Sequence, residues 1–426
     1  MSDATGTLRA LPWLSPLDGL WLARRRRAMA VIFLAIAAIG AAWVLASARD
    51  FLAFDNKPVG NDFMTFYSAA TLALEGKVTA PWDPEVLFAR QAAIMPASEG
   101  VYLWHHPPTF LLLMLGFGAL PYGAAIIAFS LFSLTLFMGA ARSLIPRGEA
   151  LLVALASPIA YLCLMNGQTG ILTGVLLTFG YAWLDRRPIL AGVCIGLLAF
   201  KPHLAILAPL LLAVSGRWTS FAAAGATVIA FFGATVLAFG FEPWRAFVEN
   251  LALTSKVLNM EDTLPWARIP SVFIMLREFG VGQDIAYAIH WLCAAGVAGL
   301  TAWVWRGDAP ADLKAATGLA AACLIPPYLF DYDLVVLCGA AALLLRAAGT
   351  GAIPAGWPTL IALLLLGPFL APLATAATGG LPLFFLATAG AFAALTTLAW
   401  PAGTPDMDKA RAGTRALPQV QRAERV

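Results

Sequence analysis

The sequence predicts an all-α fold, a polytopic transmembrane bundle of about 12 helices. Its 426 residues are 60% hydrophobic and only 12% charged, whereas a soluble domain carries roughly 25% charged residues. Apolar runs recur from residue 28 to residue 400, and about 20 apolar residues suffice for one helix to cross a bilayer. Basic residues gather in the short segments between these runs, as is typical of cytoplasmic loops. We therefore expect a single transmembrane domain over residues 28–400.

The first crossing is expected at residues 28–48. Four consecutive arginines at residues 24–27 precede it and should keep the N-terminal segment 1–27 in the cytoplasm. The apolar run at 29–48 is longer than the core of a signal peptide, and no convincing small-residue cleavage site follows it. We therefore expect this segment to be a retained helix.

A long polar segment at residues 49–106 follows the first crossing and is expected on the outer face. Within it, apolar side chains recur at helical spacing at Phe63, Phe66, Tyr67, Ala70 and Leu74. This spacing predicts a short amphipathic helix that lies on the membrane surface.

Asp62 lies at the beginning of this predicted helix. One interpretation makes it an N-cap that accepts backbone N–H bonds. The other makes it a general base that takes a proton from a hydroxyl at the boundary between water and lipid. The two roles compete, because a capping bond stabilises the ionised carboxylate and weakens it as a base.

The later apolar runs define the other crossings. We expect one crossing within 107–141, with 109–120 re-entrant or interfacial, because two crossings there would reverse the side of the later loops. The remaining crossings are expected at 149–165, 168–184, 188–200, 203–214, 219–240, 284–305, 313–330, 333–347, 357–375 and 382–400. Several are shorter than a full span, which favours broken or tilted helices around a cavity. A second outer loop is expected at 241–283 and a disordered cytoplasmic tail at 401–426.

With this topology, unusual polar residues gather on the outer face. His105 and His106 either anchor the chain at the interface beside Trp104, or one imidazole donates to a phosphate or sugar oxygen. Lys201 interrupts an apolar stretch, and an ionisable residue at membrane depth is a candidate for function. The alternative is a lysine whose ammonium group reaches the interface on its long stem.

Charge and cysteine content argue against several classes of site. The net charge is only +3, so a nucleic-acid partner is not expected. The five cysteines lie in apolar runs without CxxC spacing, so neither disulfides nor a zinc site is expected. Asp331 and Asp333 are a weak signal for a metal, and capping of the following helix is the favoured interpretation.

Several short motifs together resemble glycosyltransferase family 87. They are Asp62-Phe63 with Phe66-Tyr67 and Ala69-Ala70, residues 104–108, Gly167-Gln168, Lys201-Pro202, and Pro327-Tyr328 followed by Asp331-Tyr332-Asp333. The order and spacing of these motifs are more specific than any one of them. The resemblance implies a GT-C fold, in which a membrane helix bundle takes a sugar from a polyprenyl-phosphate donor on the outer face. It also implies mannose as the sugar, by similarity to characterised members.

The resemblance assigns the catalytic base to Asp62, because an acidic residue in the first outer loop is the hallmark of the GT-C class. The sequence carries a lone Asp here rather than an Asp-x-Asp pair, so we expect an inverting displacement without a metal or other cofactor. A leaving phosphate needs positive or donating groups, for which the candidates are Lys201, His203, His106 and Arg268. Candidates for binding sugar and acceptor hydroxyls are Tyr67, Asn166, Gln168, Asp331 and Asp333.

The expected partners are a polyprenyl-phosphate sugar, a lipid or glycan acceptor and membrane lipids. The expected location is the inner membrane, with the site facing the periplasm or outer face. The main alternative is a secondary transporter or lipid flippase, because broken helices around an ionisable residue also describe transport. No inverted repeat is visible to favour it. A scaffold without catalysis is the third hypothesis.

Overall fold

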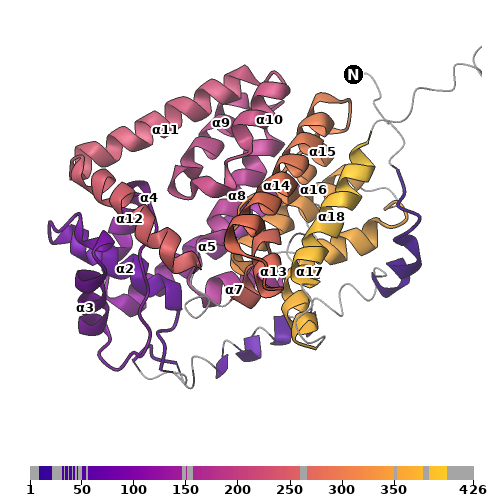
Figure 1. Ribbon diagram of the computed structural model, residues 1–426. Coiled ribbons are helices and arrows are strands. Elements are labelled where there is room, and N and C mark those ends of the chain that lie inside the picture. Colours follow the sequence, from indigo (N-terminus) through magenta and orange to yellow (C-terminus); the bar gives the residue numbers. More distant parts are fainter. Residues whose placement is uncertain are drawn as a thin grey trace, which may run out of the picture.

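The computed structural model describes residues 9–21, 56–145, 157–259, 266–349, 353–377 and 383–400, with residue 150 and scattered positions between 31 and 53. Within these ranges the chain forms helices and loops, with one isolated bridge between Leu52 and Pro58. Helices from distant parts of the sequence pack side by side in one bundle (Figure 1). The prediction of an all-α fold is confirmed.

The described helices fall into three groups along the chain. The first outer segment and its return form α2 (Asn61–Leu74), α3 (Pro84–Ile94), α4 (Pro108–Gly118) and α5 (Tyr122–Leu144). The middle of the chain forms α7 (Pro158–Met165), α8 (Gly170–Ala182), α9 (Pro188–Leu197), α10 (Ala208–Val214), α11 (Trp218–Phe239) and α12 (Glu242–Asn259). The last part forms α13 (Val272–Glu278), α14 (Gln283–Arg306), α15 (Ala311–Ala322), α16 (Val336–Ala348), α17 (Trp357–Ala377) and α18 (Leu383–Ala399).

Helix length divides this bundle into full spans and shorter pieces. Among the described residues, α5, α11 and α14 are long and apolar enough to cross a bilayer. Others are shorter: α9 has 10 residues and spans only about 15 Å at 1.5 Å per residue. Short helices are tolerated at membrane depth where protein surrounds their ends. The total of about 12 crossings stays a prediction. Of the first crossing at 28–48 only scattered positions are described, and the tail at 401–426 lies outside the described residues.

The surface position predicted for the first outer helix is wrong. Helix α2 exists, but every residue from Phe63 to Ala70 is buried. It packs against α4 on one side, and α3 and α5 also contact it. Phe66 makes an edge contact with Phe110 of α4, with ring centroids 4.8 Å apart. The apolar face of α2 therefore packs against protein rather than lipid, and its other face is covered as well. The spacing of apolar residues within one segment could not reveal this second contact.

The basic loops meet at one end of the bundle. The end of α8 and the start of α11 are joined by an ion pair between Asp185 and Arg217. Lys314, near the start of α15, lies close enough to interact electrostatically with both Asp185 and Arg217. Arg346 at the end of α16 forms an ion pair with Asp312 at the start of α15. Helices α8, α9, α15 and α16 each run between this end and the opposite one. The opposite end therefore collects the turns at about residues 167, 201 and 330.

Small residues bring α9 and α11 into close contact. Gly192 and Gly196 lie one turn apart on α9 and face α11. A Cβ atom added at Gly192 would lie 2.4 Å from the carbonyl oxygen of Ser220, and one at Gly196 would lie 2.5 Å from that of Ala224. Such spacing of small residues allows two helix backbones to approach closely within a membrane.

We expect Gly196→Leu to destabilise the bundle by about 1–3 kcal/mol, because the added side chain has no space and forces α9 and α11 apart. Thermal unfolding in detergent or nanodiscs measures the effect. Gly225→Ala is the matched control, since a Cβ atom there meets nothing within 4 Å. An unchanged unfolding temperature for Gly196→Leu would contradict the close packing.

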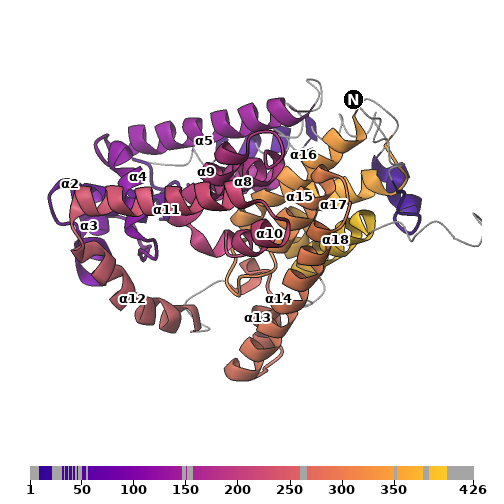
Figure 2. The same ribbon diagram turned by 90° about the horizontal axis from the view of Figure 1, so that it is seen from above.

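The second outer loop, expected at 241–283, is largely helical. It contains α12, the short 3-10 turn η5 (Trp266–Arg268) and α13. The ring of Phe273 in α13 stacks on that of Tyr287 in α14, with centroids 4.1 Å apart. Helices α12 and α13 project on the same side of the bundle (Figure 2). This segment carries η5, and with it Arg268, to the candidate site.

Candidate functional site

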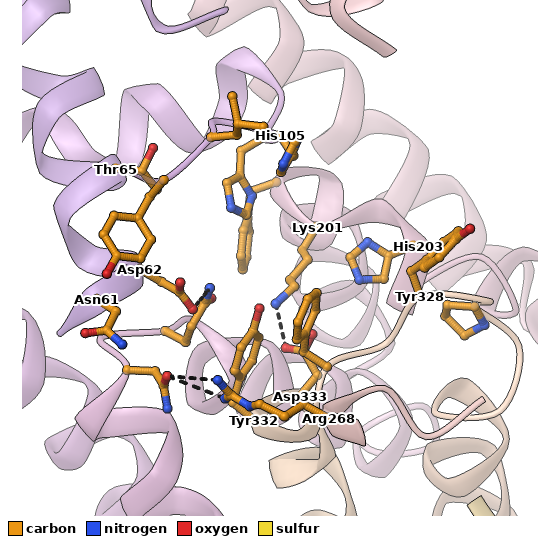
Figure 3. A pocket seen from close by; sticks show the side chains of 18 of the residues that line it. Asn61, Asp62, Thr65, His105, Lys201, His203, Arg268, Tyr328, Tyr332 and Asp333 are labelled. Atoms are coloured by element: carbon orange, nitrogen blue, oxygen red, sulfur yellow. Dashed lines mark hydrogen bonds and ion pairs between the residues drawn. The ribbon is translucent and has the colours of Figure 1, made fainter. Parts of the chain in front are cut away.

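A cavity of about 740 Å³ lies at the end of the bundle opposite the basic loops. Its wall combines the first outer segment, the turn between α7 and α8, the break between α9 and α10, η5 and the segment 326–333. Figure 3 shows labelled side chains from four of these regions, the first outer segment, the break between α9 and α10, η5 and the segment 326–333, around one cavity. Of the residues predicted for the site, those that line the cavity are Asp62, His106, Asn166, Gln168, Lys201, His203, Arg268 and Asp333.

Two glycines bring Asp62 to its partner. Gly60 precedes α2 with φ 74°, and Gly167 lies in the turn between α7 and α8 with φ 65°, a backbone region that glycine adopts without strain. A Cβ atom at Gly167 would lie 2.5 Å from that of Phe63. This close approach lets the backbone N–H of Asp62 donate to the carbonyl oxygen of Asn166 at 3.1 Å.

The Asp62 side chain accepts a hydrogen bond from Gln168, with 2.8 Å between Nε2 and Oδ2. No side chain caps α2, whose N-cap is Gly60. Of the two interpretations of Asp62, N-capping is therefore wrong. The carboxylate lies instead in the cavity wall, with Gln168 as its partner.

Burial raises the pKa of the Asp62 carboxyl above its ordinary value of 3.8. The hydrogen bond from Gln168 opposes this rise, because it stabilises the ionised form. The positive charges of Arg268 and Lys201 oppose it further. A carboxylate with a raised pKa is a better proton acceptor, provided that it stays ionised at the working pH.

Lys201 forms a buried ion pair with Asp333. The distance between Nζ and Oδ1 is 2.5 Å, and the two side chains are 5% and 3% exposed. Nζ also donates to Thr169 Oγ1 at 3.4 Å. The break between η3 (Leu198–Phe200) and η4 (Pro202–Leu204) places Lys201 here, because Pro202 cannot continue the preceding turn. The neighbouring carboxylate therefore largely balances the charge of this lysine.

A second ion pair joins Arg268 to Asp331. The guanidinium donates through two nitrogens, with Nε to Oδ2 and Nη2 to Oδ1 both at 2.8 Å. Nη1 and Nη2 lie 3.5 and 3.4 Å from Asn166 Oδ1. The Arg268 side chain is 32% exposed, so it presents more surface to the cavity than Lys201 does.

Tyr332 separates the two ion pairs. Its ring lies 5.3 Å from Lys201 Nζ and 5.8 Å from Arg268 Cζ, distances at which an aromatic face attracts a cation. The expected capping of the next helix by Asp331 or Asp333 is wrong, because no side chain caps η6 (Asp331–Val335) or α16, which follows it. Each carboxylate instead pairs with its own cation. Across the described ranges, no group of three or more His, Cys, Asp or Glu side chains converges on a point that could hold a metal.

His106 lies among aromatic rings in the cavity wall. Its ring centroid is 4.5 Å from that of Phe110 and 5.1 Å from that of Phe66. Burial lowers the pKa of His106 well below 6.5, and the nearby Lys201 lowers it further. A neutral imidazole can donate one hydrogen bond but carries no charge for a phosphate.

The structure does not bring Tyr67 to the site, so the expectation that it binds sugar is wrong. It does not line the cavity. Its hydroxyl donates to the carbonyl oxygen of Leu120 at 2.8 Å and ties α2 to the end of α4. Asp331 is also absent from the lining and pairs with Arg268.

Sequence reasoning missed several lining residues, among them Tyr332 and Thr65. In the sequence Tyr332 stands between Asp331 and Asp333. Each of these carboxylates could have been expected to pair with a cation, which would place the ring of Tyr332 near both cations. Thr65 lies three residues after Asp62, on the same face of a helix. Its position could have been noticed from this spacing alone.

The sequence comparisons give one family. The model of glycosyltransferase family 87 matches residues 104–327, just over half of the chain. No curated protein and no solved structure matches significantly. The matched range includes the cavity residues from His106 to Arg268, whereas Asp62 and Asp333 lie outside it.

Proposed function

Because this chain belongs to glycosyltransferase family 87 and is therefore a membrane enzyme that transfers sugar, we propose that it uses a polyprenyl-phosphate donor. The sugar is a hexose, and mannose is the first candidate. The acceptor is a hydroxyl of a lipid or glycan. The reaction takes place on the outer face of the inner membrane.

One observation carries this proposal: a single cavity brings the carboxylate of Asp62 close to the cations of Lys201 and Arg268. A displacement at a sugar phosphate needs a base beside the attacking hydroxyl and positive charge beside the leaving group. The cavity volume of about 740 Å³ lies within the range of roughly 300–1,000 Å³ typical of ligand sites.

The proposed reaction is a single in-line displacement. Asp62 takes the proton from the acceptor hydroxyl, and that oxygen forms a bond to the anomeric carbon. The bond from this carbon to the phosphate oxygen breaks, and polyprenyl phosphate leaves with the electron pair. One displacement inverts the anomeric configuration.

Arg268 is the better candidate for the donor phosphate, and Lys201 is the second. Arg268 is more exposed, and only two of the five N–H groups of its guanidinium are directed at Asp331, so others remain for a phosphate oxygen. Lys201 has a third N–H beyond those directed at Asp333 and Thr169. In this arrangement Asp331 and Asp333 hold the cations in place. His203 and a neutral His106 assist as hydrogen-bond donors, and Asn166 contributes its amide to the sugar.

The arrangement of charged loops supports an outer-face site. Basic side chains occupy the end of the bundle where Arg217 and Lys314 meet, and such loops remain in the cytoplasm. The cavity lies at the other ends of α8, α9, α15 and α16. A transporter is disfavoured, since the second cavity on the described helices, beside Val214, Trp303 and Arg306, shares no lining residue with this one.

Purified protein in lipid nanodiscs, incubated with a panel of radiolabelled polyprenyl-phosphate sugars and a mixture of glycolipid acceptors, tests the proposal. We expect one donor to yield labelled product with inverted configuration. Absence of transfer from every donor, with transfer detected from a nucleotide sugar instead, would overturn the choice of donor.

The pH dependence should report on the Asp62–Gln168 bond. Transfer needs ionised Asp62, so kcat falls as the pH drops through the raised pKa of this carboxyl. Gln168→Leu removes a hydrogen bond that lowers this pKa. The acid limb of the kcat profile should therefore move to higher pH. Gln283→Leu, at an exposed position at the start of α14, is the control and should leave the limb unmoved. An unmoved limb in Gln168→Leu would contradict the role of the bond.

A further inference from the structure

One polar group in the cavity wall lacks a partner. Thr65 is 3% exposed, and its Oγ1 makes no hydrogen bond to any group in the described parts of the chain. Its side chain lines the cavity. Buried hydroxyls in folded proteins almost always have a partner, so an exception that borders a ligand cavity indicates that the ligand supplies one.

The position of Thr65 relative to Asp62 restricts what that ligand group is. The two residues are three positions apart on α2 and therefore lie one above the other on one face. Figure 3 shows both on one side of the cavity, across from Lys201 and Tyr332. A group that reaches Thr65 is therefore on the side of the base, away from the cations proposed for the leaving phosphate.

The chemistry of this side suits a neutral sugar. It consists of residues 57–65 and 100–107, whose polar members include Asn61 and Thr65. Among the described residues of this wall, Lys57 is the one cationic side chain, and it is exposed. The hydroxyl of Thr65 and the amide of Asn61 can hydrogen-bond the hydroxyls of a neutral glycoside. An anionic acceptor would instead be repelled by the carboxylate of Asp62, and the described residues of this wall include no buried cation to balance its charge.

We infer that Thr65 is a specificity-determining residue that hydrogen-bonds a second hydroxyl of a neutral glycoside acceptor while Asp62 contacts the attacking hydroxyl. This inference rests on the proposed function. To that function the inference adds the chemical class of the acceptor, a neutral glycoside, and the side of the cavity that binds it. A site built to hydrogen-bond a hydroxyl discriminates strongly against an analogue that lacks it.

Thr65→Val tests the inference, because valine keeps the shape and removes the hydroxyl. The probes are octyl mannoside and its monodeoxy analogues, with the donor that supports turnover in the wild type. We expect the acceptor KM to rise about tenfold or more, the donor KM to stay unchanged, and Thr65→Ser to restore the acceptor KM. For the one deoxy analogue that lacks the contacted hydroxyl, wild type and Thr65→Val should give the same KM.

Thr71→Val is the matched control on the same helix. Its hydroxyl donates to the carbonyl oxygen of Ser68 at 2.9 Å and does not line the cavity, so both KM values should stay unchanged. An unchanged acceptor KM in Thr65→Val, or a rise in the donor KM alone, would overturn the inference.

A binding measurement separates this inference from the proposed function. Binding of octyl mannoside to the full chain in nanodiscs, followed by tryptophan fluorescence, needs no turnover. Weaker binding to Thr65→Val than to wild type supports the glycoside site even if no polyprenyl-phosphate donor is used. Equal binding to both proteins would overturn the glycoside site whatever the donor.

Discussion

Asp62→Asn is expected to lower kcat for sugar transfer by about 10²–10⁴-fold, the usual contribution of a general base. Asparagine preserves the size of the side chain and can still pair with Gln168, but it cannot take a proton. The KM for the donor should stay close to the wild-type value, since the proposed cations are untouched. Initial rates at saturating donor and acceptor measure the effect.

Glu85→Gln is the control for this loss of negative charge. Glu85 is exposed at the start of α3 in the same outer segment and does not line the cavity. The Glu85→Gln variant should transfer sugar at the wild-type rate. If Asp62→Asn also did so, Asp62 would not be the base.

Lys201→Met is expected to destabilise the protein by about 3–5 kcal/mol, because it leaves the buried carboxylate of Asp333 without its partner. Transfer should be lost at the same time. The fall in thermal unfolding temperature in nanodiscs measures the first effect. Lys77→Met removes a lysine that is 59% exposed and paired at the surface with Glu75. This control should leave the unfolding temperature close to that of the wild type, because exposed ion pairs contribute little to stability.

The double variant Lys201→Met with Asp333→Leu separates structure from chemistry. Replacing both members of a buried ion pair by apolar side chains is often neutral or stabilising, so the unfolding temperature should recover. Transfer should not recover, because the variant still lacks the second cation of the cavity. Recovery of both would mean that the pair has a purely structural role.

The sequence was sufficient for the parts of this account that depend on local pattern. Apolar run length predicted the three long membrane helices α5, α11 and α14, because a bilayer crossing requires a minimum length. The short runs at 188–200 and 203–214 predicted the short helices α9 and α10. Positions of arginine and lysine predicted which turns share an end, and the pairing of Asp185 with Arg217 agrees with this. The cavity residues Asn166, Gln168 and Lys201 were found because polar groups at membrane depth are costly.

What could not be predicted depends on contacts between distant segments. Lys201 and Asp333 are 132 residues apart, and neither residue alone indicates that the other neutralises it. Helix α2 has the pattern of a surface helix, but α3, α4 and α5 cover it. The hydroxyl of Tyr67 reaches the carbonyl oxygen of Leu120 because of that same packing. These features follow from tertiary structure, which overrides the periodicity of a single segment.

Labelling of single cysteines in spheroplasts with a membrane-impermeant maleimide tests the central claim most directly, that the cavity is open to the outer face and holds the donor. The two variants are Lys57→Cys, in the cavity lining, and Pro310→Cys, in the turn before α15 among the basic loops; both positions are exposed. We expect Lys57→Cys to react and the polyprenyl-phosphate sugar to protect it, while Pro310→Cys reacts only after permeabilisation. Labelling of Pro310→Cys but not of Lys57→Cys in intact spheroplasts would place Asp62 and its cavity on the cytoplasmic side and contradict the proposal.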